Sequence, residues 1–312
     1  MNVRFPLAPL ILSIILWIYA PLTLNAHEYN LVVGTIFKDN KPYFKEWLEF
    51  HLMVGVDHFY LYDNGSTDNP YEVLAPYIEQ GIVTLIDWPN QDYGPLKSTY
   101  TWVKNTQETA YNHCGNLVLG KAKWMAAIDT DEFLVPIGYA NLSLFLDKHD
   151  DKPGIFVWWR VYGTSNVYDI PPGKLMIELL TKRFKNNDDR NKQGKVIIKP
   201  EEFVRFNWAG HQCEYKNDAK AYISNADEIR INHYVNRTIK FFKEQKLSLK
   251  QAMDGDGFEK TYYLNLTRGN IVKDRIMNRF IPRLRQRMGF TEEENSISDS
   301  LLQHVPVLDN TP

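Results

Sequence analysis

The sequence predicts an α/β fold in which helices cover both faces of a mostly parallel sheet. Short apolar runs of strand length recur from residue 30 onward, at 31–37, 58–62 and 81–88, and amphipathic stretches separate them. Continuous apolar strands that alternate with helices are typical of a parallel sheet buried on both faces. The chain of 312 residues is long enough for one large domain or two small ones.

The first expected helix connects the strands at 31–37 and 58–62. Its inner stripe has helical spacing and consists of Phe44, Trp47, Leu48 and Leu52. Asp39 or Asn40 is expected to cap its start, and Gly55 is a natural end.

The polar segment 63–70, DNGSTDNP, is predicted to be a loop that leads into a second helix. Asp68 or Asn69 is expected to cap this helix, with Pro70 in its first turn. The next predicted elements are a longer helix and a fourth strand, over 97–114 and 123–128.

After Pro136 the composition changes, and the regular alternation of strands and helices ends. The segments expected there are an aromatic stretch at 154–166, an exposed polar loop at 181–195, short strands within 196–215, and a strand that leads into a basic helix at 226–246.

Residues 1–26 are predicted to be a signal anchor, with a cleaved signal peptide as the alternative. Arg4 precedes an uncharged stretch of about 20 residues, which can cross a bilayer as a helix. Leu24 is unfavourable for cleavage after Ala26, which favours the anchor. The positive N-terminus is expected to stay cytoplasmic, so the rest of the chain faces the lumen or the exterior. Cleavage would instead give a secreted protein.

The charge balance gives no sign of nucleic-acid binding. Lys and Arg number 36 and Asp and Glu number 38, for a formal net charge of −2, and nucleic-acid binding typically depends on excess positive charge. Only Cys114 and Cys213 occur, so no disulfide framework is expected, and two separate thiols are favoured over one bridge.

Two carboxylates follow the apolar run WMAAI. Asp129 and Asp131 are two positions apart at the end of a predicted strand, where such residues share a face. Mg²⁺ and Mn²⁺ prefer oxygen ligands and commonly use one or two carboxylates together with phosphate oxygens. The pair therefore predicts a divalent metal held against a diphosphate, with an acidic turn as the alternative.

Asp63 ends another predicted strand. A carboxylate there can accept hydrogen bonds from a base or ribose, but the DNGSTD segment also suits a turn. The glycine-rich phosphate motifs GxGxxG and GxxxxGK[ST] are absent from the sequence, which argues against a dinucleotide oxidoreductase and a P-loop enzyme.

His233 lies in the run INHYV and is a candidate to complete the metal site, with His211 as its rival. Three basic residues are expected on the helix after His233. These residues are Arg237, Lys243 and Lys246. They either neutralise a departing diphosphate or form a solvated face, and the solvated face is favoured for two of the three.

Four segments in this order resemble glycosyltransferase family 92 and similar family 2-like enzymes. They are YFKEWLEFHLMVGVDHFYLYDNGSTD, AKWMAAIDTDEFLVP, RVYGTSN and INHYVNRTIKFFKEQK. The resemblance covers roughly residues 30–250. It implies a GT-A fold, a nucleotide-sugar donor, usually a UDP-sugar, and a Mn²⁺-type (or Mg²⁺) ion. Known relatives include inverting galactosyltransferases.

The resemblance also implies roles for individual residues and for segments. It assigns the nucleotide to Asp63 and Asp129, the metal to Asp129, Asp131 and His233, and the sugar or acceptor to Gly163, Thr164 and Ser165. It divides the chain into a nucleotide-sugar-binding half at 29–135, an acceptor-binding half at 136–250 and a C-terminal tail with helices at 251–312.

The expected function is transfer of a hexose, with galactose favoured, from the donor to a glycan hydroxyl with inversion. Inversion requires a general base, for which Glu214 is the first candidate, followed by Asp254 and Asp256. Two alternatives remain, a sugar nucleotidyltransferase and a non-enzymatic membrane-anchored carbohydrate-binding protein.

Overall fold

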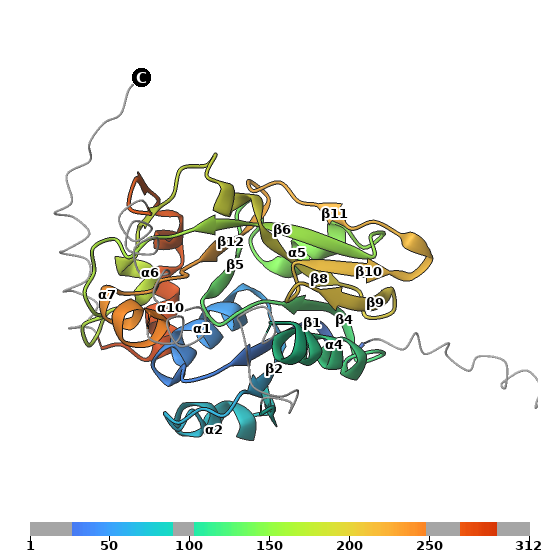
Figure 1. Ribbon diagram of the computed structural model, residues 1–312, viewed down its shortest axis with the longest axis horizontal. Coiled ribbons are helices and arrows are strands. Elements are labelled where there is room, and N and C mark those ends of the chain that lie inside the picture. The colour runs from blue at the N-terminus through green and yellow to red at the C-terminus, as the bar shows by residue number, and fades with distance from the viewer. Residues whose placement is uncertain (1–26, 90–102, 248–268, 292–312) are drawn as a thin grey trace, which may run out of the picture.

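The computed structural model describes residues 27–89, 103–247 and 269–291, and its centre is a nine-stranded mixed sheet. The spatial order is β3-β2-β1-β4-β8-β6-β12-β5, and β11 pairs with β6 (Figure 1). Helices flank this sheet, so the predicted α/β class is confirmed. The expected segment 1–26 lies outside the described residues. Within the described ranges, no helix combines the length and the apolarity needed to span a bilayer.

The first half of the sheet is parallel, as predicted. Its strands are β1 (Tyr29–Phe37), β2 (His58–Asp63), β3 (Val83–Asp87) and β4 (Ala122–Ala127). β1 pairs in parallel with β2 and β4, and β2 pairs in parallel with β3. The carboxyl ends of these four strands therefore meet at one edge of the sheet.

The helices of this half are α1 (Lys41–Val54), α2 (Tyr71–Glu79) and α4 (Glu108–Leu117). A π-helical turn, Val103–Gln107, precedes α4. The helix predicted over 97–114 therefore extends three residues further, to Leu117, and the part at 97–102 lies outside the described residues.

The helix starts differ from the predicted caps. Asn40 occupies the N-cap of α1, but its side chain does not cap the helix and bonds instead to the Lys38 carbonyl and Thr130 Oγ1. Instead, the backbone N–H of Lys41 donates to Asp68 Oδ2 at 2.7 Å, so a loop beyond β2 caps α1. Pro70 is the residue that precedes α2, again without a side-chain cap. Asp68 therefore caps the first helix and not the second.

The second half of the sheet is mixed. Its strands are β5 (Glu132–Pro136), β6 (Gly154–Val161), β8 (Gly194–Ile198), β11 (Tyr222–Ile223) and β12 (Ile229–His233). β8 is antiparallel to both β4 and β6, and β12 is parallel to β6 and antiparallel to β5. The chain thus passes from β4, inside the sheet, directly to β5 at its far edge.

Two small ladders accompany the main sheet: β9 (Phe203–Asn207) with β10 (Gln212–Tyr215), and β7 (Lys182–Arg183) with β13 (Val272–Lys273). The other α-helices are α5 (Leu142–Lys148), α6 (Met176–Leu179), α7 (Ile239–Phe241) and α10 (Ile281–Met288). The remaining helical turns are 3₁₀ at Asp189–Lys192, Lys216–Asp218 and Ile276–Arg279 and π at Phe242–Leu247. Strands predicted within 196–215 are confirmed as β8, β9 and β10.

Two apolar clusters form the core. α1 contributes Phe44, Trp47 and Phe50 to the larger one, which extends to the second half of the sheet. α4 contributes Tyr111 and Cys114 to the smaller one. α10 lies beside α1 in Figure 1, and its residues Ile281 and Leu284 are buried in the larger cluster.

Several predictions for the second half were wrong. The segment 181–195 is not an exposed loop, because Arg183, Asn191 and Lys195 are buried. The helix predicted after β12 is present as α7 and the π-helical turn that continues it to Leu247, but Arg237 precedes this helix, in a left-handed conformation with φ of 46°. Cys114 and Cys213 are free thiols, as favoured.

Candidate active site

The loop between β4 and β5 carries the acidic motif and lies at the carboxyl edge of the parallel strands. β1 and β4 pair up to Gly34 and Ala127, and the Ile128 N–H donates to the Gly34 carbonyl at 3.4 Å. Asp129 is the next residue. The predicted placement of the acidic motif beyond a buried strand is therefore what the fold produces.

Asp129 is held by side chains from three other elements. Its Oδ1 accepts hydrogen bonds from Tyr111 Oη at 2.5 Å and from Gln107 Nε2 at 2.8 Å. Its Oδ2 lies 3.0 Å from Lys195 Nζ. Both oxygens thus have partners, and the orientation of this carboxylate is set by the π-helical turn, α4 and β8.

Lys195 supplies a positive charge directly beneath the motif. Its side chain is 1% exposed, and Nζ also donates to the Ala209 carbonyl at 2.7 Å. Burial opposes ionisation of Asp129, but the Lys195 ammonium and the Tyr111 hydrogen bond hold the pKa of Asp129 below its usual value. Part of the negative charge of the motif is therefore neutralised by the protein itself.

Glu132 is the third carboxylate and is fully buried. Its Oε2 accepts from the Asp129 N–H at 2.9 Å, whereas its Oε1 has no hydrogen-bond partner in the described part of the chain. Burial raises the pKa of Glu132 well above its usual value, and the charges of Asp129 and Asp131 raise it further. Its visible role is to orient the loop between β4 and β5.

Asp131 and His233 come together across the sheet. His233 Nε2 lies 3.4 Å from Asp131 Oδ1, and their side chains are 9% and 13% exposed. The β5–β12 ladder pairs His233 with Glu132, and the Tyr234 N–H donates to the Asp131 carbonyl at 2.8 Å. Sequence analysis assigned these two residues, about 100 positions apart, to one site, and their side chains are neighbours in the structure.

Arg237 lies behind the same loop and is buried. Its Nη2 donates to Thr130 Oγ1 at 3.2 Å, and its guanidinium stacks on Tyr43 and Phe241 at 3.9 and 4.6 Å from the ring centroids. Lys243, by contrast, is exposed. Arg237 thus contacts the acidic loop, whereas the solvated face weighed in the sequence analysis describes Lys243.

The donor atoms fit a metal in part. Within the described ranges, no group of three or more His, Cys, Asp or Glu side chains is arranged to hold a metal ion. Asp131 and His233 offer an oxygen and a nitrogen to one point, which suits an ion that takes its other ligands from phosphate and water. In addition, His233 Nδ1 is buried and lacks a hydrogen-bond partner among those residues. Asp129 is already engaged by Lys195.

Asp63 ends β2 beside Phe37 of β1 and Asp87 of β3. Its Oδ1 accepts from the Ser66 N–H at 2.8 Å, so the carboxylate closes the turn that follows the strand. The turn role weighed in the sequence analysis is thus present. The structure leaves the expected nucleoside contact a prediction.

Gly163, Thr164 and Ser165 pack against a distant segment of the chain. A Cβ atom on Gly163 would lie 2.3 Å from Asn270 Oδ1, and the Ser165 N–H donates to that same atom at 2.7 Å. Thr164 is buried. The hydroxyls of Ser165 and Thr164 accept from the N–H groups of Lys182 and Asn166 at 2.8 and 3.3 Å. These contacts give all three residues a structural role, and the substrate role stays a prediction.

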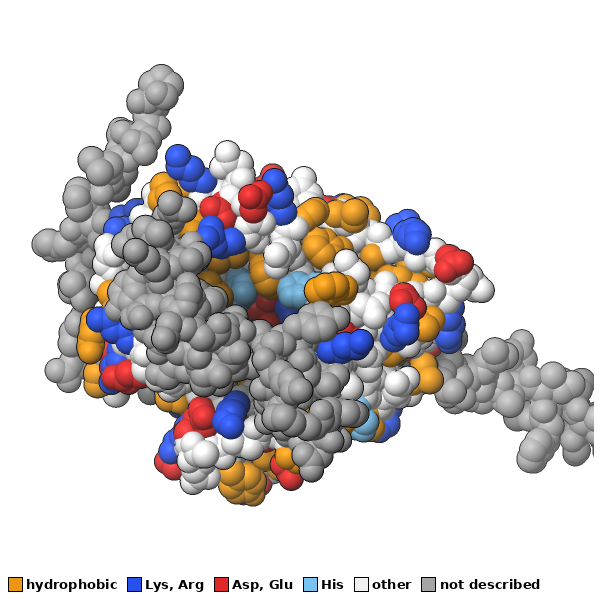
Figure 2. All heavy atoms as spheres, viewed as in Figure 1, with side chains coloured by type: hydrophobic (Ala, Val, Ile, Leu, Met, Phe, Trp, Pro, Cys, Tyr) orange, Lys and Arg blue, Asp and Glu red, His pale blue; other side chains and the backbone are white. Residues whose placement is uncertain are grey.

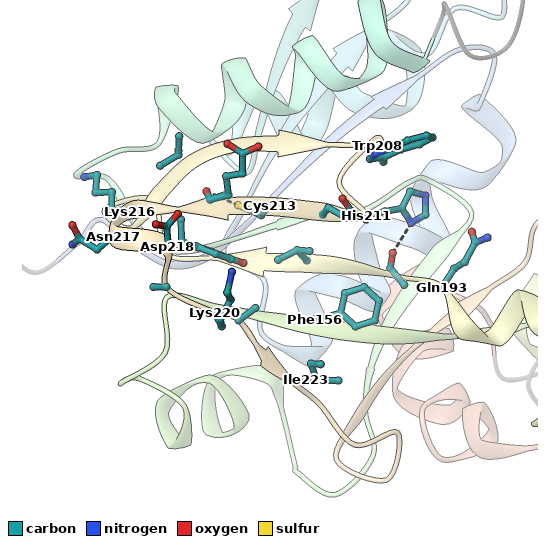
Figure 3. A pocket seen from close by; sticks show the side chains of 18 of the residues that line it. Phe156, Gln193, Trp208, His211, Cys213, Lys216, Asn217, Asp218, Lys220 and Ile223 are labelled. Atoms are coloured by element: carbon teal, nitrogen blue, oxygen red, sulfur yellow. Dashed lines mark hydrogen bonds between the residues drawn. The ribbon is translucent and has the colours of Figure 1, made fainter.

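Two adjoining cavities open next to the motif. The smaller, of about 290 Å³, is lined by Asp129 and Lys195, among others. The larger, of about 1090 Å³, runs along β10 and is drawn in Figure 3. Both are lined by Gln193, Trp208 and His211. Figure 2 shows acidic and histidine side chains at the bottom of a hollow on this face.

His211 stands between the cavities. Its Nδ1 lies 2.6 Å from the Gly194 carbonyl oxygen, which can only accept, so the proton is on Nδ1 (Figure 3). Burial, and then the Lys195 charge, lowers the pKa of His211 to about 4. Trp159 separates the two histidines, with centroid distances of 4.9 Å to His211 and 4.3 Å to His233.

Glu214 lines the larger cavity on β10. Its Oε1 accepts from Arg205 Nη2 at 2.8 Å and from Asn207 Nδ2 at 3.0 Å. The hydrogen bond from Arg205 lowers the pKa of Glu214. The reserve candidates Asp254 and Asp256 lie outside the described residues.

Sequence reasoning missed Lys195, Tyr111 and Trp208. Lys195 stood in a segment expected to be an exposed loop, although it directly precedes the apolar run VIIKP. A lysine at the start of a buried strand was the signal that could have identified it. Tyr111 was hidden in a helical pattern typical of core packing.

An α/β sheet with paired carboxylates, a histidine and an open cavity at the carboxyl ends of its parallel strands defines a class of ligand-binding enzyme. The chain belongs to glycosyltransferase family 92, whose sequence profile matches residues 27–275. The resemblance seen in the motifs is thereby confirmed.

Individual relatives agree with the family. A glycosyltransferase family 92 protein of Ricinus communis is 26% identical over 226 residues, which cover 70% of this chain and 37% of that protein. A galactan β-1,4-galactosyltransferase of Arabidopsis thaliana is 33% identical over 121 residues, covering 38% of this chain and 22% of that enzyme. The chain thus spans little more than a third of the length of the first relative.

Solved structures are only distantly similar. The crystal structure of S. aureus TarS has a TM-score of 0.37 and 10% sequence identity, over 73% of this chain and 40% of that one.

Proposed function

We propose that this protein is a metal-dependent glycosyltransferase of the GT-A fold. It would transfer a hexose, galactose first among the candidates, from a UDP-sugar to a glycan hydroxyl with inversion. Family membership and the galactosyltransferase relatives support the class of reaction. The observation that carries the mechanism is the 3.4 Å distance from His233 Nε2 to Oδ1 of Asp131, which lies in the loop whose Asp129 lines the smaller cavity.

Each residue has a proposed task. Asp131 and His233 hold Mn²⁺ or Mg²⁺, whose positive charge stabilises the leaving diphosphate when bound. Asp129, fixed by Lys195, binds the nucleotide-sugar without being the principal metal ligand, which modifies the expectation from the motif. Asp63 binds the nucleoside.

The acceptor side remains as expected from the family. Gly163, Thr164 and Ser165 would support the sugar or the acceptor, and Glu214 would accept the proton of the attacking hydroxyl. Arg205 and Asn207 both bind Oε1 of Glu214, so Oε2 would be the atom that accepts the proton. We also propose that residues 1–26 anchor the chain in a membrane, with the catalytic part lumenal or extracytoplasmic.

The test is a transfer assay with a panel of UDP-sugars, with and without Mn²⁺. We expect transfer from one donor that requires the metal and falls at least 100-fold in Asp131→Asn and in His233→Gln. The matched control is Asp169→Asn, which removes an exposed carboxylate paired with Lys240 and should change transfer less than twofold.

Other outcomes distinguish the alternatives. Nucleotide-sugar synthesis from a sugar phosphate would identify a nucleotidyltransferase. Glycan binding without turnover, in a folded sample and with every donor, would identify a carbohydrate-binding protein. Full transfer in Glu214→Gln would remove Glu214 from the mechanism.

A further inference from the structure

The structure assigns the larger cavity to the acceptor glycan, with the indole of Trp208 as the surface on which an acceptor sugar stacks. This inference rests on the proposed function and names the cavity and the side chain that would bind its acceptor. It commits to an oligosaccharide whose reacting end lies toward Asp129 and whose remaining residues follow β10.

Trp208 is held in an exposed position by its backbone. Its side chain is 58% exposed, although it adjoins the most buried charges of the site. Trp208, Ala209 and Gly210 all have left-handed φ angles, of 52°, 54° and 78°. Such a run is costly for residues other than glycine, so it persists only where the surroundings hold it.

The surroundings that hold this turn belong to the active site. The Trp208 N–H donates to Glu108 Oε2 at 2.8 Å, and the Ala209 carbonyl accepts from Lys195 Nζ at 2.7 Å. Lys195 is also the partner of Asp129. The Lys195 ammonium therefore binds both the Asp129 carboxylate and the turn that carries the exposed Trp208.

The two cavities form one path. Gln193, Trp208 and His211 line both of them, whereas Asp129 and Lys195 line the smaller. A ligand in the larger cavity that extends past Trp208 therefore reaches the acidic motif. This continuity is what distinguishes the cavity from an unrelated surface groove.

The walls match the chemistry of a sugar chain, which presents apolar C–H faces and a rim of hydroxyls. Figure 3 shows Phe156 and Ile223 along the cavity between Trp208 at one end and Asn217 at the other. Polar side chains such as Gln193 alternate with them. At about 1090 Å³, the cavity exceeds the roughly 300–1,000 Å³ typical of small-molecule pockets, so it suits several sugar residues rather than one.

The experiment compares Trp208→Ala and Trp208→Phe with Tyr71→Ala, which removes an aromatic side chain of similar exposure (54%) from α2. Acceptors are β-1,4-linked galacto-oligosaccharides of two and five residues. We expect Trp208→Ala to raise the acceptor KM about tenfold, the scale of a lost aromatic contact, and Trp208→Phe to restore most of it. Tyr71→Ala should leave KM unchanged.

A second variant tests the extent of the path. Ile223→Ser, at a site 62% exposed on β11, should weaken the pentasaccharide and not the disaccharide. A Trp208→Ala effect on the donor KM alone would assign the indole to the donor and overturn the proposal. Equal KM values in all variants would do the same.

Binding measured without donor separates this proposal from the proposed function. Titration of the pentasaccharide into the wild-type protein should show binding that Trp208→Ala weakens about tenfold, even if no donor supports transfer. Transfer with acceptor binding unaffected by both variants would keep the glycosyltransferase and reject this subsite.

Discussion

Asp129 and Lys195 act as a pair at the scale of the residue. The ammonium is almost fully buried, and its contacts in the described chain are the carboxylate, the Ala209 carbonyl and the Tyr111 ring. A charge in such a place is stable because its partner is present, and removal of either member leaves the other uncompensated.

We therefore expect Lys195→Met and Asp129→Asn each to lower the free energy of unfolding by about 3 kcal/mol, measured by urea denaturation. The double variant should lose clearly less than the sum of the two, because no unpaired charge remains. Lys192→Met is the control, since its pair with Asp189 is 70% and 90% exposed and should contribute little to stability. Strict additivity would contradict the coupling.

His51 makes stability depend on pH. Its Nδ1 donates to the Trp47 carbonyl at 2.8 Å and its Nε2 accepts from the Leu134 N–H at 3.1 Å, so the neutral ring is fully satisfied. Burial lowers the pKa of His51 from 6.5 to about 3. The unfolded chain therefore binds the proton more tightly, and this contribution to stability is complete above pH 6.5 and is lost as the pH falls toward 3.

Between pH 7 and pH 5 the loss should be about 2 kcal/mol in the wild type. This part of the loss should be absent from His51→Gln, whose stability is expected to be lower at pH 7 but to fall by about 2 kcal/mol less than that of the wild type; some loss remains because His211 still titrates. Urea unfolding at both pH values measures the difference, and parallel curves for the two proteins would show that His51 does not titrate as described.

The structural positions of site residues could be predicted from the sequence where the local pattern of a strand determined them. Asp129, Asp131 and Asp63 were placed correctly at strand ends because a buried strand stops where its polar residues begin. Lys195 and Arg237 could not be, because their burial depends on partners from elements about 66 and 107 positions earlier in the chain.

At the scale of the element, the turn 208–210 between β9 and β10 places three consecutive residues at left-handed φ angles. Gly210 tolerates φ of 78° because it has no Cβ, and an added Cβ would lie 3.1 Å from Ala127 Cβ. Ala209 adopts φ of 54° although its Cβ atom makes this conformation unfavourable.

Ala209→Gly should consequently raise the free energy of unfolding by up to about 1 kcal/mol, and Gly210→Ala should lower it by about 1–2 kcal/mol. Thermal unfolding of the two variants gives opposite shifts in Tm if the turn has the described geometry. Shifts of the same sign would mean that another conformation is populated.

α10 shows why element prediction weakened toward the C-terminus. Leu284 is fully buried against the larger cluster, and Arg287 pairs with Glu49 of α1 at 2.8 Å. Helices were expected within 251–312, but the bounds of α10 were not predicted, because a helix of this length is stabilised by its contact with α1.

Leu284→Ala should lower the free energy of unfolding by about 2–5 kcal/mol, as expected for a large-to-small change in a packed core. Arg283→Ala, on the exposed side of α10, should change it by less than about 0.5 kcal/mol. Chemical denaturation compares them. Equal small effects would show that α10 is not docked as described.

At the scale of the whole molecule, the sequence predicted the topology of the parallel half of the sheet but not that of the mixed half. The parallel half was predictable because β1, β2 and β3 are neighbours in the order of the chain, as in right-handed βαβ units, and β4 then returns to the other side of β1. The mixed half was not, because β5 and β12 pair across 97 sequence positions and no local pattern encodes such a partner.

The pairing of β5 with β12 also has a consequence for how the protein is made. Asp131 leaves the ribosome about 100 residues before His233, which at roughly 5–20 residues per second is a delay of about 5–20 s. During translation the nascent chain therefore carries an acidic loop without its histidine and an unpaired strand edge, a state prone to aggregation. The proposed Asp131–His233 site is therefore completed late in synthesis, and cells that produce this chain have reason to shield that strand edge until then.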